Sequence, residues 1–345
     1  MADGGRPAAP ARGGEGGGAP PAGEAAGPHP RPLDPQVEDL LRRIRRAGRP
    51  PFWQYTVDEA RAFHEKASPV LDIAPAPVAA VADLSIPVPG GRIPARLYTS
   101  HGAADPAPLL IFAHGGGFTI GSIGTSDAVC RRLASGAACK VLSLGYRLAP
   151  EHRFPTAAED VYAAWRWAFD AHRELGVDRL RIAGIGDSAG GTLTAQAALR
   201  ARDDGLPLAA QVLLYPGTGA WPDTASHRAY AQGYLLDART IEWFFGHYLR
   251  DDADRLDWRF APLLAPDCAG LAPALLQLAE CDPLFCEGVA YGRRLAQAGV
   301  EVRTRVYAGV VHGFYHMGGA LRAAREAHRD TIDYLLAVFA SAKRT

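Results

Sequence analysis

The chain has 345 residues, 48% of them hydrophobic, which is enough apolar material for one large domain or two smaller ones. Its formal net charge is zero, and no basic field suggests a nucleic-acid partner. No apolar run reaches the roughly 20 residues of a membrane span, and no apolar leader opens the chain. We therefore expect a cytoplasmic protein with no stable membrane insertion.

The five cysteines are odd in number and lie in a long chain, so we expect free thiols rather than a disulfide framework. No Cys-x-x-Cys pair or histidine cluster at zinc spacing occurs, and we expect neither a metal nor another cofactor. Cys281 and Cys286 flank the acid proposed below, where a redox role stays open.

Residues 1–33 are rich in Gly, Ala and Pro, and we expect a disordered tail. In residues 34–80 two helices are expected, one after Leu33-Asp34-Pro35 and one starting at Thr56. The arginines of the first are interpreted as a solvated face rather than a membrane-binding one: Arg42, Arg43, Arg45 and Arg46.

From about Val81 the pattern changes to strands. A hairpin is expected over 84–99, around Gly90-Gly91. Beyond it strands alternate with helices. The expected strands are 109–113, 141–144, 180–185, 211–215, 274–278 and 302–307, and the expected helices are 127–138, 156–175, 189–202, 288–298 and 321–342. This alternation predicts an α/β fold, with a mostly parallel central sheet flanked by helices.

Residues 217–272 interrupt the alternation with an aromatic-rich insertion that includes a helix at 238–249. It follows the carboxyl end of a strand, where active sites of such sheets lie. We interpret it, with residues 34–80, as a helical cap on a catalytic domain of residues 81–345. An ordinary sheet-covering helix is the alternative.

Ser188 is the candidate nucleophile. It lies in Gly186-Asp187-Ser188-Ala189-Gly190, between a strand-like and a helix-like segment. This setting is typical of a nucleophile on a sharp strand-to-helix turn, where only small neighbours fit.

His114-Gly115-Gly116-Gly117 follows an earlier strand, and its N–H groups are suited to binding an oxyanion. We take Gly115 and Gly116 as the first donors, Gly117 as a third, and Ala189 as a donor from the helix N-terminus. We expect His114 to hold the loop.

The base and the acid are expected downstream, in the order Ser, Asp or Glu, His. His312 follows a late strand and is the predicted base, with His316 as the alternative. Asp282 follows another strand and is the predicted acid, with Glu280 and Glu287 as alternatives.

With these residues in place, the chain resembles the bacterial hormone-sensitive-lipase-like esterases of the α/β-hydrolase fold. The resemblance runs from about Leu33 to the C-terminus and rests on five motifs in order: His114-Gly115-Gly116-Gly117-Phe118, Tyr146-Arg147-Leu148-Ala149-Pro150-Glu151-His152, Gly186-Asp187-Ser188-Ala189-Gly190-Gly191, Asp282-Pro283-Leu284 and His312-Gly313-Phe314. It implies a Ser188–Asp282–His312 triad, a capped site, and short- to medium-chain or aryl ester substrates. It is compatible with a homodimer.

The chain departs from the family pattern at Gly145, Cys286 and Thr192, where Asp, Asp and Asn are usual. These positions bear on loop rigidity and substrate preference. Three other functions remain open at this point: an amidase or arylformamidase with the same triad, a non-catalytic small-molecule receptor on this fold, and a peptidase.

Overall fold

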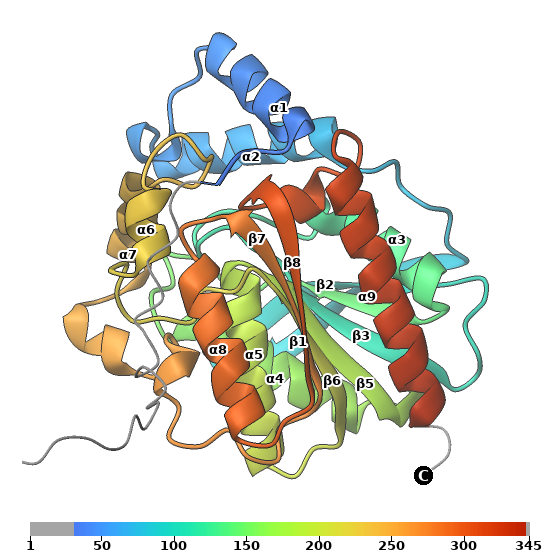
Figure 1. Ribbon diagram of the computed structural model, residues 1–345. Helices are drawn as coiled ribbons and strands as arrows, with labels where there is room; N and C mark the ends of the chain where they lie inside the picture. The colour runs from blue at the N-terminus through green and yellow to red at the C-terminus, as the bar shows by residue number, and fades with distance from the viewer. Residues whose placement is uncertain (1–30, 343–345) are drawn as a thin grey trace, which may run out of the picture.

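The computed structural model describes residues 31–342, so nearly all of the expected tail lies outside the described residues. At the centre is a twisted sheet of eight strands in the order β1-β2-β4-β3-β5-β6-β7-β8 (Figure 1). The strands are β1 (Ala80–Val88), β2 (Gly91–Thr99), β3 (Ala107–Ala113), β4 (Lys140–Leu144), β5 (Val177–Asp187), β6 (Leu208–Leu214), β7 (Ala274–Cys281) and β8 (Val302–Val311).

The sheet combines an antiparallel edge with a parallel body. β1 pairs with β2 and β2 with β4 in antiparallel register, while every pair from β4 to β8 is parallel. β3 is buried along its whole length, as expected for an apolar strand covered on both faces. The predicted fold class, an α/β-hydrolase with a mostly parallel central sheet, is confirmed.

Helices cover both faces of this sheet (Figure 1). One face carries α3 (Asp127–Ala137) and α9 (Arg322–Ser341), which contact each other. The other carries α4 (Thr156–Asp170), α5 (Ala189–Asp203) and α8 (Phe285–Gln297). Trp165 of α4 is fully buried between α4 and the sheet, where a Cβ on Gly184 would lie 2.2 Å from its ring. This close approach of α4 explains why a glycine interrupts the apolar strand β5.

Two N-terminal helices lie beyond the carboxyl ends of the strands (Figure 1). Helix α1 (Pro35–Arg46) is capped by Asp34 and keeps Val37, Leu40 and Leu41 buried while its four arginines are exposed. Helix α2 (Val57–Leu71) begins at Thr56 with a reciprocal capping box to Glu59. Both helices begin where the sequence predicted them, after Asp34 and at Thr56.

The insertion after β6 contains α6 (Ala225–Ala229) and α7 (Ala238–Tyr248), followed by the 3₁₀ turns η3 (Asp252–Leu256) and η4 (Pro262–Leu264). Helix α7 packs against the 3₁₀ turn η1 (Phe52–Gln54) of the N-terminal segment. The two chain segments expected to form a cap thus meet on the same side of the sheet (Figure 1).

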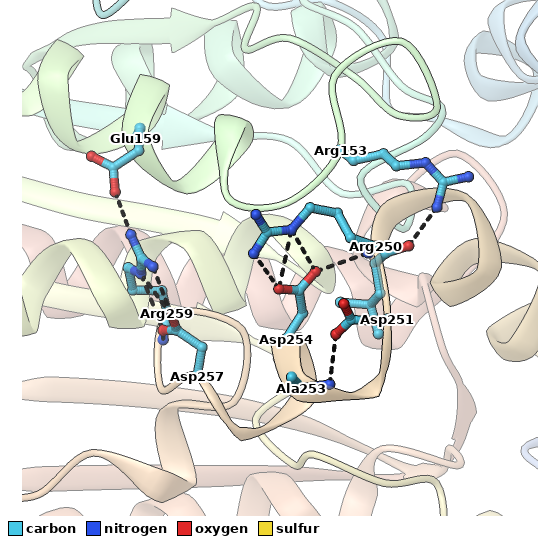
Figure 2. Close-up of polar contacts among 9 residues, drawn as sticks. Arg153, Glu159, Arg250, Asp251, Ala253, Asp254, Asp257 and Arg259 are labelled. Atoms are coloured by element: carbon cyan, nitrogen blue, oxygen red, sulfur yellow. Dashed lines mark hydrogen bonds and ion pairs between the residues drawn. The ribbon is translucent and has the colours of Figure 1, made fainter.

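Arginine–carboxylate contacts attach the second half of the insertion to the body (Figure 2). Arg250 donates from its backbone N–H and its guanidinium to Asp254, and Arg259 contacts both Asp257 and Glu159 of α4. Asp254 is only 4% exposed, although it follows the acidic pair Asp251-Asp252 in a segment whose charges would be expected to be solvated. Its arginine partner lies four residues earlier, and this pairing keeps the carboxylate ionised in a buried position.

Element boundaries differ mainly where strands run further than expected. β5 begins at Val177 and β8 continues to Val311, whereas the expected strands covered only 180–185 and 302–307. Helix α4 ends at Asp170 instead of Leu175. Both strands are longer than expected because they pair with neighbouring strands, and local sequence does not reveal that pairing.

Candidate active site

Ser188 sits between β5 and α5 with backbone angles φ 54° and ψ −121°. Few residues other than glycine adopt such a positive φ, which indicates a strained turn. The flanking glycines make the turn sterically feasible. A Cβ on Gly186 would lie 2.1 Å from the carbonyl oxygen of Gly190, and a Cβ on Gly190 would lie 2.0 Å from the carbonyl oxygen of Ala113.

The structure brings Ser188, His312 and Asp282 together from three separate loops. The Oγ of Ser188 lies 2.8 Å from Nε2 of His312, whose Nδ1 lies 2.7 Å from Oδ2 of Asp282. The other Asp282 oxygen accepts the backbone N–H of Leu284 at 2.8 Å. The edge of the Tyr215 ring packs against the imidazole. This geometry suits proton transfer from the hydroxyl to an oriented imidazole.

The glycine loop differs from expectation at its first glycine. The N–H of Gly115 donates to Oδ1 of Asp187 at 2.9 Å, so it is used within the protein. Gly116 and Gly117, both at positive φ, and Ala189 line the same cavity as Ser188. Ala189 is the first residue of α5, where N–H groups have no intrahelical acceptor. The expectation that Gly115 is a first oxyanion donor is therefore corrected: it anchors the loop.

His114 lies buried beneath this loop. Its Nδ1 is 2.7 Å from the carbonyl oxygen of Gly115, and its ring stacks on Tyr146 with centroids 4.3 Å apart. Tyr146 in turn donates its hydroxyl proton to the carbonyl of His114 at 2.7 Å. The Tyr-Arg-Leu-Ala-Pro-Glu segment thus supports the glycine loop from behind.

The alternative acids have other partners. Glu280 accepts the N–H of Gly309 at 2.9 Å. Glu287 is buried and accepts the N–H groups of Thr218 and Gly219, at 2.9 and 3.2 Å. Burial raises the pKa of Glu287 to about 8, although the bond from Thr218 opposes that shift. Neither carboxylate contacts His312, and Glu287 holds the start of the insertion in place.

A cavity of about 830 Å³ leads to Ser188. Its walls combine the glycine loop with both cap segments, including Phe52, Phe63, Trp221 and Phe244. A Cβ on Gly117 would lie 2.2 Å from the ring of Phe244, so α7 packs directly on the glycine loop. Large apolar cavities with a few polar groups are typical small-molecule sites.

Sequence reasoning overlooked Asp187 as a functional residue. The sequence analysis gave it no role between Gly186 and Ser188, yet its carboxylate is buried and contacts both the glycine loop and His316. A buried aspartate beside the nucleophile would have been the signal, but burial cannot be assigned from the motif alone.

The chain is similar to known hydrolases over most of its length. Residues 110–316 match a family model described as the alpha/beta hydrolase fold. The chain is 41% identical over 304 residues to an ethyl acetate hydrolase of Pseudomonas putida, covering 85% of this chain and 95% of that protein. It is 47% identical over 253 residues to the carboxylic ester hydrolase LipN of Mycobacterium tuberculosis, covering 70% and 67% of the two chains.

Among solved structures, an ester hydrolase from the metagenome of Lake Arreo, complexed with a bipyridine phosphonate derivative, superposes with a TM-score of 0.86. The two are 39% identical over 89% of this chain and 99% of that chain. The chain belongs to the α/β-hydrolase family and, within it, to the hormone-sensitive-lipase-like esterases. It is a serine carboxylesterase.

Within residues 31–342, no helix is both long and apolar enough to cross a bilayer. No group of three or more His, Cys, Asp or Glu side chains in that range is arranged to hold a metal ion.

Proposed function

We propose that Ser188, His312 and Asp282 are the catalytic triad of this esterase. The observation that carries the proposal is the continuous hydrogen-bonded chain from the serine Oγ through the imidazole to the aspartate, at 2.8 and 2.7 Å. In this arrangement His312 takes the serine proton as Oγ attacks the ester carbonyl. Asp282 holds the ring in the tautomer whose Nε2 accepts that proton.

The negative charge that develops on the carbonyl oxygen is stabilised by the N–H groups of Gly116, Gly117 and Ala189. His312 then protonates the leaving alcohol, and a water molecule, deprotonated by the same imidazole, releases the acid from Ser188. No step in this sequence needs a metal or cofactor.

Ser188→Ala tests the assignment. We expect the variant to fold normally but to lose at least about 10⁴-fold in kcat on p-nitrophenyl butyrate. Ser68→Ala is the matched control, because Ser68 lines the same cavity but bonds to His64 and its backbone carbonyl rather than to His312. Turnover by Ser188→Ala at the rate of the control would overturn the triad.

We further propose that the substrates are short- to medium-chain or aryl esters. The apolar walls of the cavity and its closure by Phe244 over Gly117 support this class. The relatives named above act on esters, which favours esters over the amide alternative. An acyl-length series of p-nitrophenyl esters, with a matched p-nitroanilide, measures both preferences; higher kcat/KM on the anilide would reverse the assignment.

The domain division is also proposed: a catalytic domain of residues 81–345, capped by residues 34–80 and the insertion at 217–272. Contact of α7 with η1 supports a cap made from both segments.

A cytoplasmic location is supported by the five free cysteines, as in proteins of reducing compartments. The partner is a small-molecule ester rather than nucleic acid, and the family resemblance supports a homodimer, which light scattering would test.

A further inference from the structure

His316 forms a buried contact that the triad does not use. It ends the 3₁₀ turn η5 (Phe314–His316), and its Nε2 lies 3.3 Å from Oδ2 of Asp187. The other oxygen of the same carboxylate, Oδ1, accepts the N–H of Gly115 at 2.9 Å. One carboxylate therefore joins the imidazole on one side to the glycine loop on the other.

The glycine loop packs tightly onto this carboxylate. A Cβ added at Gly115 would lie 2.3 Å from Oδ2 and 3.0 Å from Cγ of Asp187. Only a glycine allows the backbone to approach so closely, and the approach is what makes the 2.9 Å bond possible. Gly116 and Gly117, which follow directly, depend on this anchor for their position.

We propose that His316 is a positioning residue for the oxyanion site. As an imidazolium it pairs with Asp187, which in turn fixes Gly115 and thereby the N–H groups of Gly116 and Gly117. The inference rests on the proposed function, because it assumes that those N–H groups face the reacting carbonyl oxygen.

A charged partner is needed here because Asp187 is buried. A buried carboxylate without a counter-charge would take up a proton or turn toward solvent, and either change weakens its bond to Gly115. Burial alone would raise the pKa of Asp187, but the charge of His316 and its hydrogen bond bring that pKa below the ordinary value. Burial would likewise lower the pKa of His316, yet Asp187 and then Asp72 raise it to about 9.

Other titratable groups surround His316 without supplying its charge. Burial lowers the pKa of each neighbouring histidine, so these rings are neutral near pH 7: His64 of α2, His114 of the glycine loop and His328 of α9. Asp72, at the end of α2, accepts the N–H of Ile73, and burial raises its pKa. The imidazolium thus faces two carboxylates and no second cation among these groups.

This arrangement separates the roles of the two histidines that the sequence left as rivals for the base. His312 contacts Ser188, while the Nε2 of His316 is directed at Asp187. His316 acts on catalysis only through the loop that it helps to hold.

His316→Phe and His316→Gln test the proposal. Phenylalanine keeps a ring but neither charge nor donor, and we expect kcat on p-nitrophenyl butyrate to fall about 10- to 100-fold, with KM changing less than threefold. Glutamine keeps an N–H donor for Asp187, and we expect it to restore a large part of the lost kcat. The KM-against-kcat split follows because an oxyanion donor acts mainly in the transition state.

His328→Gln is the matched control. His328 is also a buried imidazole and contacts the carbonyl oxygen of Tyr315 in the same turn, but it does not touch Asp187. We expect its substitution to lower stability while leaving kcat within about threefold. A well-folded His316→Phe enzyme with the kcat of His328→Gln would overturn the proposal.

The wild-type enzyme gives a second test that needs no folded variant. Since His316 loses its proton near pH 9, we expect kcat to fall above that pH; a flat kcat from pH 8 to 10 would overturn the proposal. In a folded His316→Gln enzyme the same fall should be absent, and its persistence would also count against His316. If the proposed triad were wrong, the result would be different: Ser188→Ala would retain activity.

Discussion

Steric exclusion governs the site at the scale of single residues. The turn at Ser188 holds a non-glycine residue at positive φ. The residues two positions away on each side, Gly186 and Gly190, are glycines because carbonyl oxygens occupy the space that a Cβ would need. The same constraint recurs at Gly115, where a carboxylate fills that space. Each glycine of the two motifs is therefore explained by a close approach of other atoms.

Gly190→Ala is expected to be severely destabilising. Its new methyl group would lie 2.0 Å from the carbonyl oxygen of Ala113, a backbone atom that cannot move without displacing β3. We expect the free energy of unfolding to fall by about 3 kcal/mol or more, measured by urea denaturation. Gly246→Ala in α7 is the control. It has open space for a Cβ, and we expect it to be neutral or stabilising by about 0.5–1 kcal/mol. Equal stability of the two variants would contradict this steric account.

At the scale of elements, the insertion after β6 is attached through an ion pair and through the loop after β7. Ser226 of α6 donates to the carbonyl of Pro283 at 2.6 Å and accepts the N–H of Cys286 at 3.0 Å. The insertion therefore bonds directly to the loop that carries Asp282. Farther along, Arg259 bonds to Glu159 of α4, while Arg250 and Asp254 pair within the insertion (Figure 2). Substrate-binding walls and catalytic loops are consequently joined into one structure.

Removing the buried carboxylate of Asp254 should lower the stability of the protein measurably. For Asp254→Ala we expect a loss of about 1–2 kcal/mol in unfolding free energy, because the backbone N–H of Arg250 loses its acceptor together with the ion pair. Asp252→Ala is the comparison. Its carboxylate is 78% exposed and pairs only with Arg255, so we expect a change within about 0.5 kcal/mol. Thermal melts of both variants measure the difference, and a larger loss for Asp252→Ala would contradict the assignment.

At the scale of the whole molecule, buried ionisable groups make stability depend on pH. Burial, opposed by a bond from Thr218, raises the pKa of Glu287 to about 8, and the carboxylates around His316 raise its pKa to about 9 against the effect of burial. In the unfolded chain these groups titrate near their ordinary values, 4.5 and 6.5. Between those values and the raised ones, the folded protein holds more protons than the unfolded chain, so its stability falls as pH rises.

We expect the unfolding free energy to fall between pH 7 and pH 9. Both groups contribute up to pH 8, which limits the slope to about 2.7 kcal/mol per pH unit, and His316 alone contributes from there to pH 9. Urea titrations at pH 7, 8 and 9 measure this fall in the unfolding free energy. Glu287→Gln should reduce the slope in the first interval only, whereas His316→Gln should reduce the slope in both intervals. A wild-type stability that stays constant across the range would show that these two pKa values are not raised.

Much of this was predictable from local sequence. Helical spacing after Asp34 and the start signal at Thr56 predicted both N-terminal helices, and the alternation of strands and helices predicted the sheet. The chain order of Ser188, Asp282 and His312 predicted three residues that the fold then places in contact. Such features are readable because capping and hydrophobic periodicity act over only a few residues.

The rest depended on contacts between distant parts of the chain. The sequence by itself determined the fold class, the two glycine-rich turns and the residue types available for catalysis. Only the tertiary structure decided that the N–H of Gly115 bonds to Asp187, that Asp254 is buried, and that His316 contacts Asp187 and not Ser188. The physical reason is that Gly115 and Asp187 are 72 residues apart in the chain and His316 lies farther still, while the burial of Asp254 is set by packing, and no local pattern encodes such contacts.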